Sequence, residues 1–445
     1  MAAGREAAVD ALTACRRLEA WSDGSLKAAC RELDRREAAL ASRLTYGVLQ
    51  NRALLDFYLD HCCSQPFTGL EPFVRDVLRL GAYQILFMDR VPDSAAVDES
   101  VELVKRRRRQ RAAGMVNAVL RRLSREKGAL PAIPDDDAAE YLSLRYSHPR
   151  WLVERLLDLL GREEAEAYLR LDNESVPTVI QRNPLRCTAE QLTESLEASG
   201  ARLAPHSWMP DCWYLSGGGG PEAMPAFQAG WFQIQDAAAK GAALAAGVKR
   251  GDRVLDVCAA PGGKSFAAAM EMGDAGQVVS CDIHPHKLAL IEKGAQRLGL
   301  NCVTPELADG RQERAEWLEC FDVVLCDVPC SGLGIIRKKP DIRYKDPAAL
   351  AGLPGVQKAI LDNACRYVRP GGVLLYATCT ILPEENRGIT DAFLAEHGAF
   401  CMEPFVLPGL AEENDGSLSL WPQRHGTDGF YICKMRALGG RPNSL

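Results

Sequence analysis

Hydrophobic and polar positions follow three different patterns along the chain, and each pattern predicts a fold of its own. From residue 1 to about 135 apolar residues recur at spacings of three and four, as in EPFVRDVLRLGAYQILFM, residues 71–88. This spacing places apolar side chains on one face of a helix, so we predict an all-α domain over residues 1–135. The segment ALPAIPDDD, rich in proline and aspartate, marks its end.

The remaining two patterns contain strands. Between residues 140 and 225 helical stretches alternate with the short strand candidates TVIQRN and WYLSG, which predicts a small α+β domain. Between residues 226 and 438 nearly continuous apolar runs alternate with helical segments. Such runs are typical of parallel strands covered on both faces. We therefore predict a doubly wound, Rossmann-like α/β domain whose ligands bind at the carboxyl ends of the strands.

The first of these apolar runs ends in a glycine turn, DVCAAPGGKS, residues 256–265. Gly262 and Gly263 allow the backbone to turn tightly beside a ligand, but neither GxGxxG nor GxxxxGK[ST] is present. The next two strand candidates end near Asp282 and Asp309, where a carboxylate can accept ribose hydroxyl groups. Either aspartate alone could be a helix cap or a turn residue. Together with the glycine turn they predict an adenosine-containing cofactor, and the absence of a phosphate loop favours S-adenosylmethionine over NAD or ATP.

Two further strand candidates each lead into a loop that carries a cysteine. FDVVLCDVPCSG contains Cys330 and LLYATCTILPEEN contains Cys379. Cysteine is often buried as a small apolar residue, and this explanation accounts for the cysteines that read as part of strands, namely Cys258, Cys281 and Cys326. It does not account for Cys330 and Cys379, which follow strands and lie beside polar residues and a proline. Both are therefore candidate catalytic thiols.

Composition restricts the class of protein further. The chain has 445 residues, of which 47% are hydrophobic and 25% charged, as in ordinary globular proteins. No apolar run reaches the roughly 18 residues of a membrane helix, and the first residues lack the apolar core of a signal peptide. We therefore expect a cytoplasmic protein without a membrane partner. The sixteen cysteines contain no CxxC pair, so we expect reduced thiols and no metal site.

The charge distribution leaves two readings open. The formal net charge of −6 argues weakly against a nucleic-acid partner, but local charge matters more than the total. The run KRRRRQR concentrates basic residues, which are Lys105, Arg106, Arg107, Arg108, Arg109 and Arg111. Such a run is either a solvated helix face or a patch that binds RNA phosphates.

The quoted motifs carry a family resemblance. DVCAAPGGK, DVPCSGLGIIRKKPD and YATCTILPEEN resemble motifs of the RNA cytosine-5 methyltransferases. With AVDESVELVK, GMVNAVLRRL, SHPRWLVERL and WFQIQDAAA included, nearly the whole chain is similar to the bacterial 16S ribosomal RNA branch, called RsmB or Sun. The resemblance implies a NusB-like RNA-binding domain over 1–135, an RRM-like domain over 140–225, and a class I S-adenosylmethionine-dependent methyltransferase domain over 226–438.

The resemblance also implies roles for individual residues. Cys379 would attack C6 of a cytidine in 16S ribosomal RNA, Cys330 would aid product release, and Asp327 would contact the cytosine edge or the cofactor. Lys264 could face the substrate instead of the cofactor. The implied cofactor-binding residues are Cys258, Ala259, Ala260, Pro261, Gly262, Gly263, Lys264, Asp282, Asp309 and Asp327.

Alternatives within and outside the enzymes stay open at this point. The substrate could be another RNA such as transfer RNA, since the choice of RNA depends on the NusB-like region alone. DNA is disfavoured because DNA enzymes use the Pro-Cys cysteine as nucleophile, whereas this chain also has the Thr-Cys motif at Cys379. A non-catalytic RNA-binding factor is disfavoured because the site is complete. Thr380 and Arg387 depart from the family, which often has serine and an acidic residue there. We expect a monomer.

Overall fold

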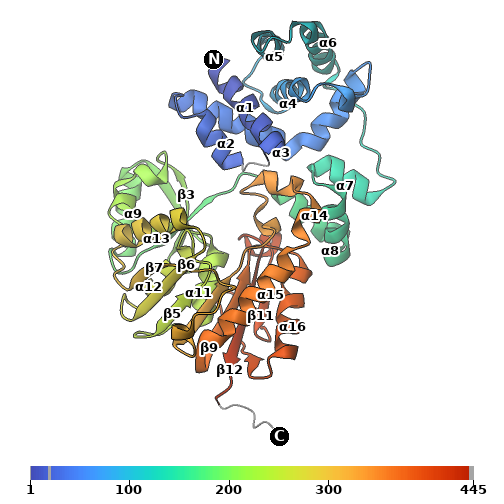
Figure 1. Ribbon diagram of the computed structural model, residues 1–445. Helices are drawn as coiled ribbons and strands as arrows, with labels where there is room; N and C mark the ends of the chain where they lie inside the picture. Colours follow the sequence, from blue (N-terminus) through green and yellow to red (C-terminus); the bar gives the residue numbers. More distant parts are fainter. Residues whose placement is uncertain (1, 19–21, 440–445) are drawn as a thin grey trace. The chain divides into compact units, whose positions relative to one another are not determined.

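The computed structural model describes residues 2–18 and 22–439, which divide into two compact units (Figure 1). The first comprises Met1–Ser175 together with Ile336–Lys345, and the second comprises Val176–Ile335 together with Asp346–Leu445. We call them the helical unit and the sheet unit. The predicted division into domains 1–135, 140–225 and 226–438 stays a prediction, because each of the two units combines two separate stretches of the chain.

The helical unit confirms the predicted all-α, NusB-like fold. The stripe seen in residues 71–88 forms α4 (Pro72–Phe87), which is buried on most of its sides and contacts α1, α3, α5 and α6. This central position explains why α4 is the most apolar helix of the group. The other helices are α1 (Ala2–Leu18), α2 (Ser22–Ala29), α3 (Arg35–Cys62), α5 (Asp93–Arg106), α6 (Gln110–Glu126), α7 (Ala138–Tyr146) and α8 (Arg150–Leu171).

A segment from far along the sequence completes the helical unit. Ile336–Lys345 follows the Pro-Cys motif, yet it packs with residues 1–175. Within it Arg343 is fully buried and donates to carbonyl oxygens of α3 and of the α7–α8 connection. The Tyr344 hydroxyl donates to the carbonyl of Leu49 (2.6 Å), just before α3 bends at the non-helical Asn51. A bend frees helical carbonyls, so these two side chains satisfy groups that would otherwise be buried without partners.

A four-stranded antiparallel sheet in the order β2-β3-β1-β4 takes three strands from the predicted α+β region, 140–225, and β4 from just beyond it. The two strand candidates are confirmed as β1 (Thr178–Arg182) and β3 (Cys212–Gly217). Between them α9 (Ala189–Ala198) begins with a capping box at Thr188 and packs on the sheet. The other strands are β2 (Ala201–Pro205) and β4 (Phe232–Ile234).

The Rossmann-like prediction is confirmed by a sheet in the order β10-β12-β9-β8-β5-β6-β7, with β11 paired to β12. Strands β5 to β9 are parallel, whereas β10 to β12 are antiparallel. The chain order reverses between β5 and β8, which is where such sheets bind ligands. The strands are β5 (Arg253–Asp256), β6 (Gln277–Asp282), β7 (Val303–Leu307), β8 (Phe321–Asp327), β9 (Val368–Thr378), β10 (Phe400–Met402), β11 (Ser417–Leu420) and β12 (Phe430–Ala437).

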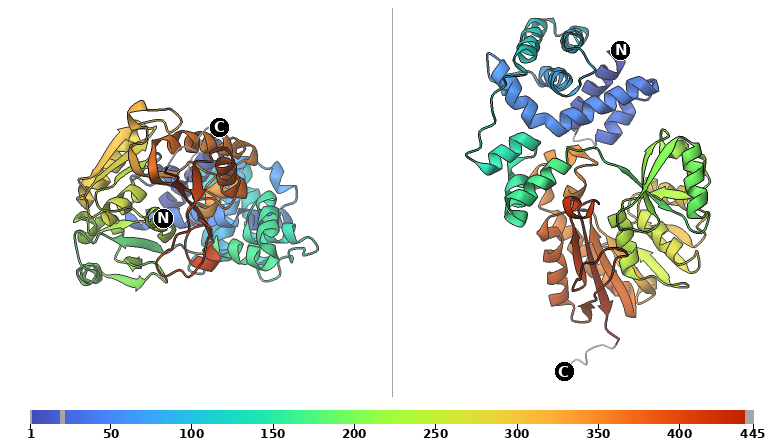
Figure 2. Two further views of the ribbon diagram at one scale, coloured as in Figure 1. Left: turned by 90° about the horizontal axis from the view of Figure 1, so that it is seen from below. Right: turned by 180° about the vertical axis from the view of Figure 1, so that it is seen from behind.

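Helices cover both faces of this sheet (Figures 1 and 2). Successive residues of a strand serve opposite faces, so Val254 packs with one group of helices and Leu255 with the other. The first group is α11 (Ala237–Ala246), α12 (Gly263–Glu271) and α13 (Pro285–Leu298), and the second is α15 (Leu353–Ala364) and α16 (Arg387–Glu396). Short helices are α10 (Pro225–Gln228), α14 (Pro347–Leu350) and α17 (Pro422–His425). Among the described residues, no helix combines the length and apolar character that a membrane span requires.

Candidate active site

The two strand-end cysteines meet at the carboxyl ends of two neighbouring strands. Parallel strands β8 and β9 pair with Asp327 opposite Ala377, so the loops that follow emerge side by side. Cys330 and Cys379 lie in these loops, with their Sγ atoms 3.3 Å apart and their side chains half-buried. The structure therefore brings together the two thiols that the sequence singled out.

The surroundings of Cys330 affect the pKa of its thiol. The pKa of Cys330 is raised well above its ordinary value, first by its hydrogen bond with Cys379, then by burial and by the charges of Glu385 and Asp327. All three effects favour the neutral form. Cys330 is therefore protonated at neutral pH and can direct its S–H toward the sulfur of Cys379.

Backbone and hydroxyl contacts join the two cysteine loops. The hydroxyls of Ser331 and Thr380 lie 2.6 Å apart, so the threonine supplies the hydroxyl that serine supplies in much of the family. The Gly334 N–H donates to the Cys379 carbonyl (3.0 Å), and the Gly429 N–H donates to the Gly334 carbonyl (2.8 Å). A Cβ added at Gly334 would lie 2.0 Å from the Gly429 carbonyl oxygen, so this approach requires glycine.

A cavity of about 360 Å³ lies next to the cysteine loops. Its volume is within the usual range for small-molecule sites. Apolar side chains alternate with three carboxylates around it, which suits a purine ring bound to a hydroxylated sugar. The residues that line it are Val257, Cys258, Ala260, Asp282, Ile283, His284, Lys287, Ala308, Asp309, Gly310, Arg311, Asp327, Val328, Pro329, Val356 and Ile360.

The carboxylates of the cavity are held in defined positions. Asp282 ends β6, is 6% exposed, and accepts the backbone N–H of His284 (2.9 Å). Asp309 pairs with Arg311 (2.7 Å), whose hydrogen bond lowers the pKa of that carboxyl group. Asp309 is therefore ionised at neutral pH. The donor set fits an adenosine-containing cofactor, since both aspartates present acceptors to the cavity.

The predicted glycine turn contributes only part of this lining. Cys258 and Ala260 line the cavity, whereas Ala259, Pro261, Gly262, Gly263 and Lys264 are not among the lining residues. The expectation that Cys258 belongs to a strand was wrong. β5 ends at Asp256, because the chain turns there toward α12, and Cys258 lies in the turn.

Lys264 pairs with a residue at the end of β8 and does not line the cavity. Its Nζ atom lies 2.6 Å from Oδ2 of Asp327 and 4.9 Å from the ring centroid of Phe430. Burial alone lowers the pKa of Lys264, but the charge and hydrogen bond of Asp327 outweigh it and the pKa rises. The two residues therefore form an ion pair between a buried lysine and a half-buried aspartate, directly before the Pro-Cys loop.

Sequence reasoning missed two acidic residues at this edge of the sheet. Asp256 ends β5, is fully buried, and accepts the Ser265 hydroxyl (2.7 Å); burial raises its pKa to about 7. Glu385 lies in the loop after Cys379 and is 2% exposed. The available signals were the position of Asp256 at a strand end and the acidic pair that follows the Thr-Cys motif. Arg387, the second departure from the family, pairs with Asp415 at 2.8 Å.

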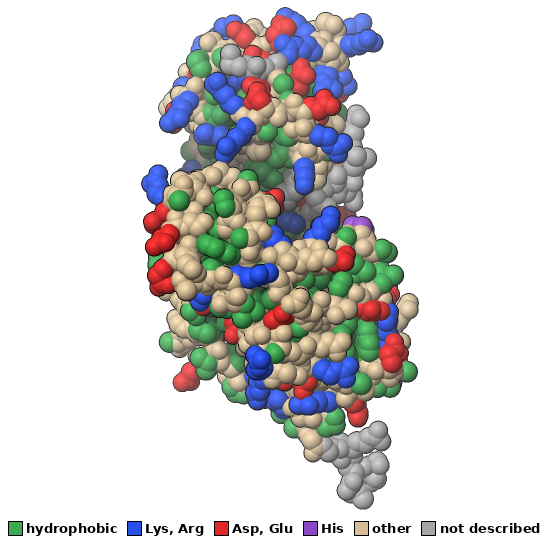
Figure 3. Space-filling view, turned by 90° about the vertical axis from the view of Figure 1, so that its left-hand side faces the viewer, with side chains coloured by type: hydrophobic (Ala, Val, Ile, Leu, Met, Phe, Trp, Pro, Cys, Tyr) green, Lys and Arg blue, Asp and Glu red, His purple; other side chains and the backbone are tan. Residues whose placement is uncertain are grey.

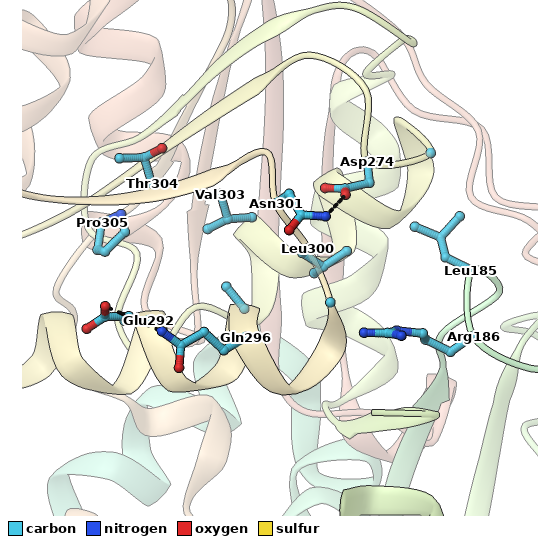
Figure 4. A pocket seen from close by; sticks show the side chains of 13 residues that line it. Leu185, Arg186, Asp274, Glu292, Gln296, Leu300, Asn301, Val303, Thr304 and Pro305 are labelled. Atoms are coloured by element: carbon cyan, nitrogen blue, oxygen red, sulfur yellow. Dashed lines mark hydrogen bonds between the residues drawn. The ribbon is translucent and has the colours of Figure 1, made fainter. Parts of the chain in front are cut away.

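A second cavity of the sheet unit is larger than the one next to the cysteine loops and lies at a different place in the fold. It measures about 780 Å³ and is lined by α13, the turn after it and the start of β7, at the amino ends of the parallel strands (Figure 4). Its labelled polar side chains include Arg186, Glu292 and Asn301, with Asn301 donating to Asp274 (3.0 Å). It contains no thiol, so chemistry and not volume identifies the site.

One group of side chains has the composition of a metal site. Within the described part of the chain, Asp362, Glu396 and His397 could together offer ligands to an ion. The Lys358 ammonium already lies 2.7 Å from both Asp362 and Glu396. The Lys358 ammonium thus already supplies a positive charge to these carboxylates. The expectation that the protein binds no metal stays a prediction.

The basic run spans the end of α5, a turn and the start of α6, and does not form one helix face. Four of its side chains have acidic partners: Lys105 pairs with Glu102, Arg106 with Glu6, Arg107 with Asp10 and Arg109 with Glu71. In the part of the chain that the structure describes, Arg108 and Arg111 are exposed and have no ion pair. Figure 3 shows Lys and Arg interspersed with acidic side chains over the helical unit, at the top of the view. RNA binding by the run stays a prediction.

A doubly wound sheet with an adenosine-type cavity at the carboxyl ends of its strands is typical of the class of S-adenosylmethionine-dependent methyltransferases. Family descriptions match the chain in three places: 16S rRNA methyltransferase RsmB/F over 243–436, the NusB family over 2–125, and the ferredoxin-like domain of RsmF/B-like methyltransferases over 148–219. The chain belongs to the RsmB/F family of 16S rRNA methyltransferases.

Individual relatives match the sequence of this chain over almost their whole lengths. The probable ribosomal RNA small subunit methyltransferase B of Bacillus subtilis is 36% identical, over 98% of this chain and 99% of its own. The ribosomal RNA small subunit methyltransferase B of Salmonella typhi is 33% identical, over 90% of each chain. Among solved structures, PH0851 superposes with a TM-score of 0.83 at 25% identity, over 98% of both chains. NSun6 from Pyrococcus horikoshii has the same fold over 66% of this chain and 99% of its own, with a TM-score of 0.58 at 21% identity.

Proposed function

We propose that the protein methylates carbon 5 of a cytidine in 16S ribosomal RNA. The observation that carries this proposal is the 3.3 Å separation of the Cys330 and Cys379 sulfurs beside a cavity suited to S-adenosylmethionine. The relatives named above are small-subunit RNA methyltransferases, which supports 16S ribosomal RNA as the substrate. A cytoplasmic location goes with that substrate.

The chemistry explains why the site uses two thiols. C5 of cytosine is a poor nucleophile until a thiolate adds to C6 and passes its electrons into the ring. A cysteine thiolate is strongly nucleophilic near neutral pH, and Cys379 is assigned this role. S-Adenosylmethionine, held by Asp282, Asp309 and the turn at Cys258, would supply the electrophilic methyl group.

Release requires a second set of groups. Once C5 carries the methyl group, its proton leaves as a base accepts it. The electrons of that C–H bond then restore the C5–C6 double bond and expel the Cys379 sulfur from C6. Cys330 is assigned to this stage because its thiol contacts the sulfur that departs. Asp327 ends β8, pairs with Lys264 and would contact the cytosine edge or the cofactor.

Trapping the intermediate tests the proposal. Cys330→Ala protein incubated with 16S ribosomal RNA and S-adenosylmethionine should run on a denaturing gel as a slow-migrating protein–RNA adduct. The adduct should disappear in Cys330→Ala/Cys379→Ala, and methyl transfer in Cys379→Ala should fall by roughly 10³-fold or more. A matched incubation with transfer RNA identifies the other RNA class. No adduct with either RNA, while the cofactor still binds, would refute the covalent mechanism.

A further inference from the structure

A buried carboxylate lies between the two cysteine loops. Glu385 ends the short helix η7 (Pro383–Glu385) and is 2% exposed. Its Oε2 atom accepts the backbone N–H of Ser331 (2.9 Å), the residue directly after Cys330. Its Oε1 atom accepts the hydroxyl of Thr380 (3.3 Å), the residue directly after Cys379. One carboxylate therefore touches both loops immediately beyond their thiols.

A buried glutamine provides a second contact to the Cys330 loop. Gln357 of α15 donates from Nε2 to Oε2 of Glu385 (2.8 Å) and to the carbonyl of Pro329 (3.0 Å). Glu385 and Gln357 thus bind the peptide groups on both sides of Cys330. Because both side chains are buried against packed neighbours, they fix the backbone from which the Cys330 thiol projects.

The Cys379 loop has additional supports that do not involve Glu385. Cys379 follows β9 directly, and β9 is paired on both sides by β8 and β12. Asn386 donates to the carbonyl of Thr380 (3.0 Å) and accepts the hydroxyl of Thr378 (2.5 Å). Loss of the Glu385 contacts therefore displaces Cys330 more than Cys379.

The contacts of Glu385 are strong ones. Burying an ionised carboxylate is unfavourable unless donors compensate it, and here an N–H, an amide and a hydroxyl supply that compensation. Hydrogen bonds to charged acceptors are about twice as strong as those between neutral groups. The charge also helps to raise the pKa of Cys330, which keeps its thiol protonated.

We propose that Glu385 is a positioning residue that holds Cys330 against Cys379 for product release. The proposal rests on the function proposed above and adds a residue to it. Glu385 acts through the Ser331 and Gln357 contacts and touches neither RNA nor cofactor. Its loss should therefore slow release more than attack or methyl transfer.

Glu385→Gln tests this at nearly constant shape, because it removes the charge and an amide cannot accept at both ends. The variant therefore loses either the Thr380 contact or the contacts to Ser331 and Gln357. Steady-state methylation should fall by roughly 10²-fold, the size expected when a reacting group is misplaced by about 1 Å. Single-turnover methyl transfer should fall much less, and a protein–RNA adduct should accumulate as in Cys330→Ala. Glu384→Gln, the exposed neighbour, should behave like the unchanged protein.

Adduct accumulation separates positioning from a general structural role. A purely structural residue would lower methyl transfer and adduct together, and that result, or a turnover equal to that of Glu384→Gln, would overturn the proposal. Gln357→Leu keeps the test decisive if Glu385→Gln fails to fold, since it removes the contact to Pro329 and a donor to Glu385, and it should also accumulate adduct. If Cys330→Ala itself forms no adduct in the same gel, the proposed function has failed and not the assignment of Glu385 alone.

Discussion

The carboxyl edge of the large sheet and the basic run between α5 and α6 were both prominent in the sequence. In the structure, the residues of the first lie together, whereas those of the second do not. At the sheet edge, residues separated by dozens of positions converge: Asp282, Asp309, Cys330 and Cys379 surround or adjoin one cavity. In the basic run, neighbours in sequence diverge: four of six cations pair with carboxylates, and three of these carboxylates come from other parts of the helical unit.

The difference follows from what each signal depends on. Parallel strands in register present their carboxyl ends together, so a strand-end residue has a predictable location once the sheet is known. Whether an arginine is neutralised depends on whether a carboxylate lies within ion-pair distance, and that carboxylate can come from any part of the chain. Glu6 and Asp10, for example, are nearly a hundred residues from the arginines they pair with.

The largest effect should come from the sheet edge. Asp282→Asn removes the charge that the cavity presents at the end of β6, so S-adenosylmethionine should bind about 10- to 100-fold more weakly, as expected for a lost hydrogen bond to a charged group. Isothermal titration with the cofactor measures this. Asp391→Asn, an exposed aspartate of α16, removes the same charge and should change nothing. Equal affinity in both variants would place the ribose contact elsewhere.

A smaller effect should distinguish the paired from the unpaired cations of the basic run. Arg108→Ala/Arg111→Ala removes two cations without acidic partners, so the salt dependence of RNA binding should become shallower by roughly 1 to 2 in log–log slope. Arg106→Ala/Arg107→Ala removes two paired cations and should change the slope less. Anisotropy titrations over a salt series measure both variants. Equal slopes for the two would show that pairing is irrelevant, and an unchanged slope would make the run a solvated surface.

The smallest effect should be a pH dependence of stability that arises at the sheet edge. Burial raises the pKa of Asp256 to about 7, so the native protein keeps a proton that the unfolded chain releases near pH 4. This contribution to the free energy of unfolding is complete below about pH 4 and is lost as the pH rises through about 7. Asp256→Asn cannot titrate, so its melting temperature relative to the unchanged protein should increase by a few degrees over that interval.

Thermal melts across the pH series measure that difference directly. Because both proteins share every other titrating group, carboxylates with lowered pKa values such as Glu403 cancel in the comparison. A difference that is constant with pH would mean that Asp256 is ionised in the native state throughout.

Much of the site could be predicted because its signals are local. Apolar runs that end in Cys330, Cys379 or Asp282 show both the strand and the point at which it stops. The error at Cys258 has the same origin, since an apolar residue beyond a strand end reads as more strand. Asp256 and Glu385 gave weaker signals, a strand end and an acidic pair after the Thr-Cys motif, and Gln357 gave none. Only packing shows that these three polar side chains are buried.

By itself, the sequence determined the helical, α+β and Rossmann-like regions, the cofactor class and the two thiols, since periodicity and strand-end chemistry are properties of short stretches. Only the tertiary structure decided which cations of the basic run are neutralised, that Lys264 pairs with Asp327, and that Glu385 bridges the two cysteine loops. It also decided that Arg343, just past the Pro-Cys motif, is buried in the helical unit. Each of these depends on contacts between distant residues, whose energies are fixed by burial and geometry that no local pattern encodes.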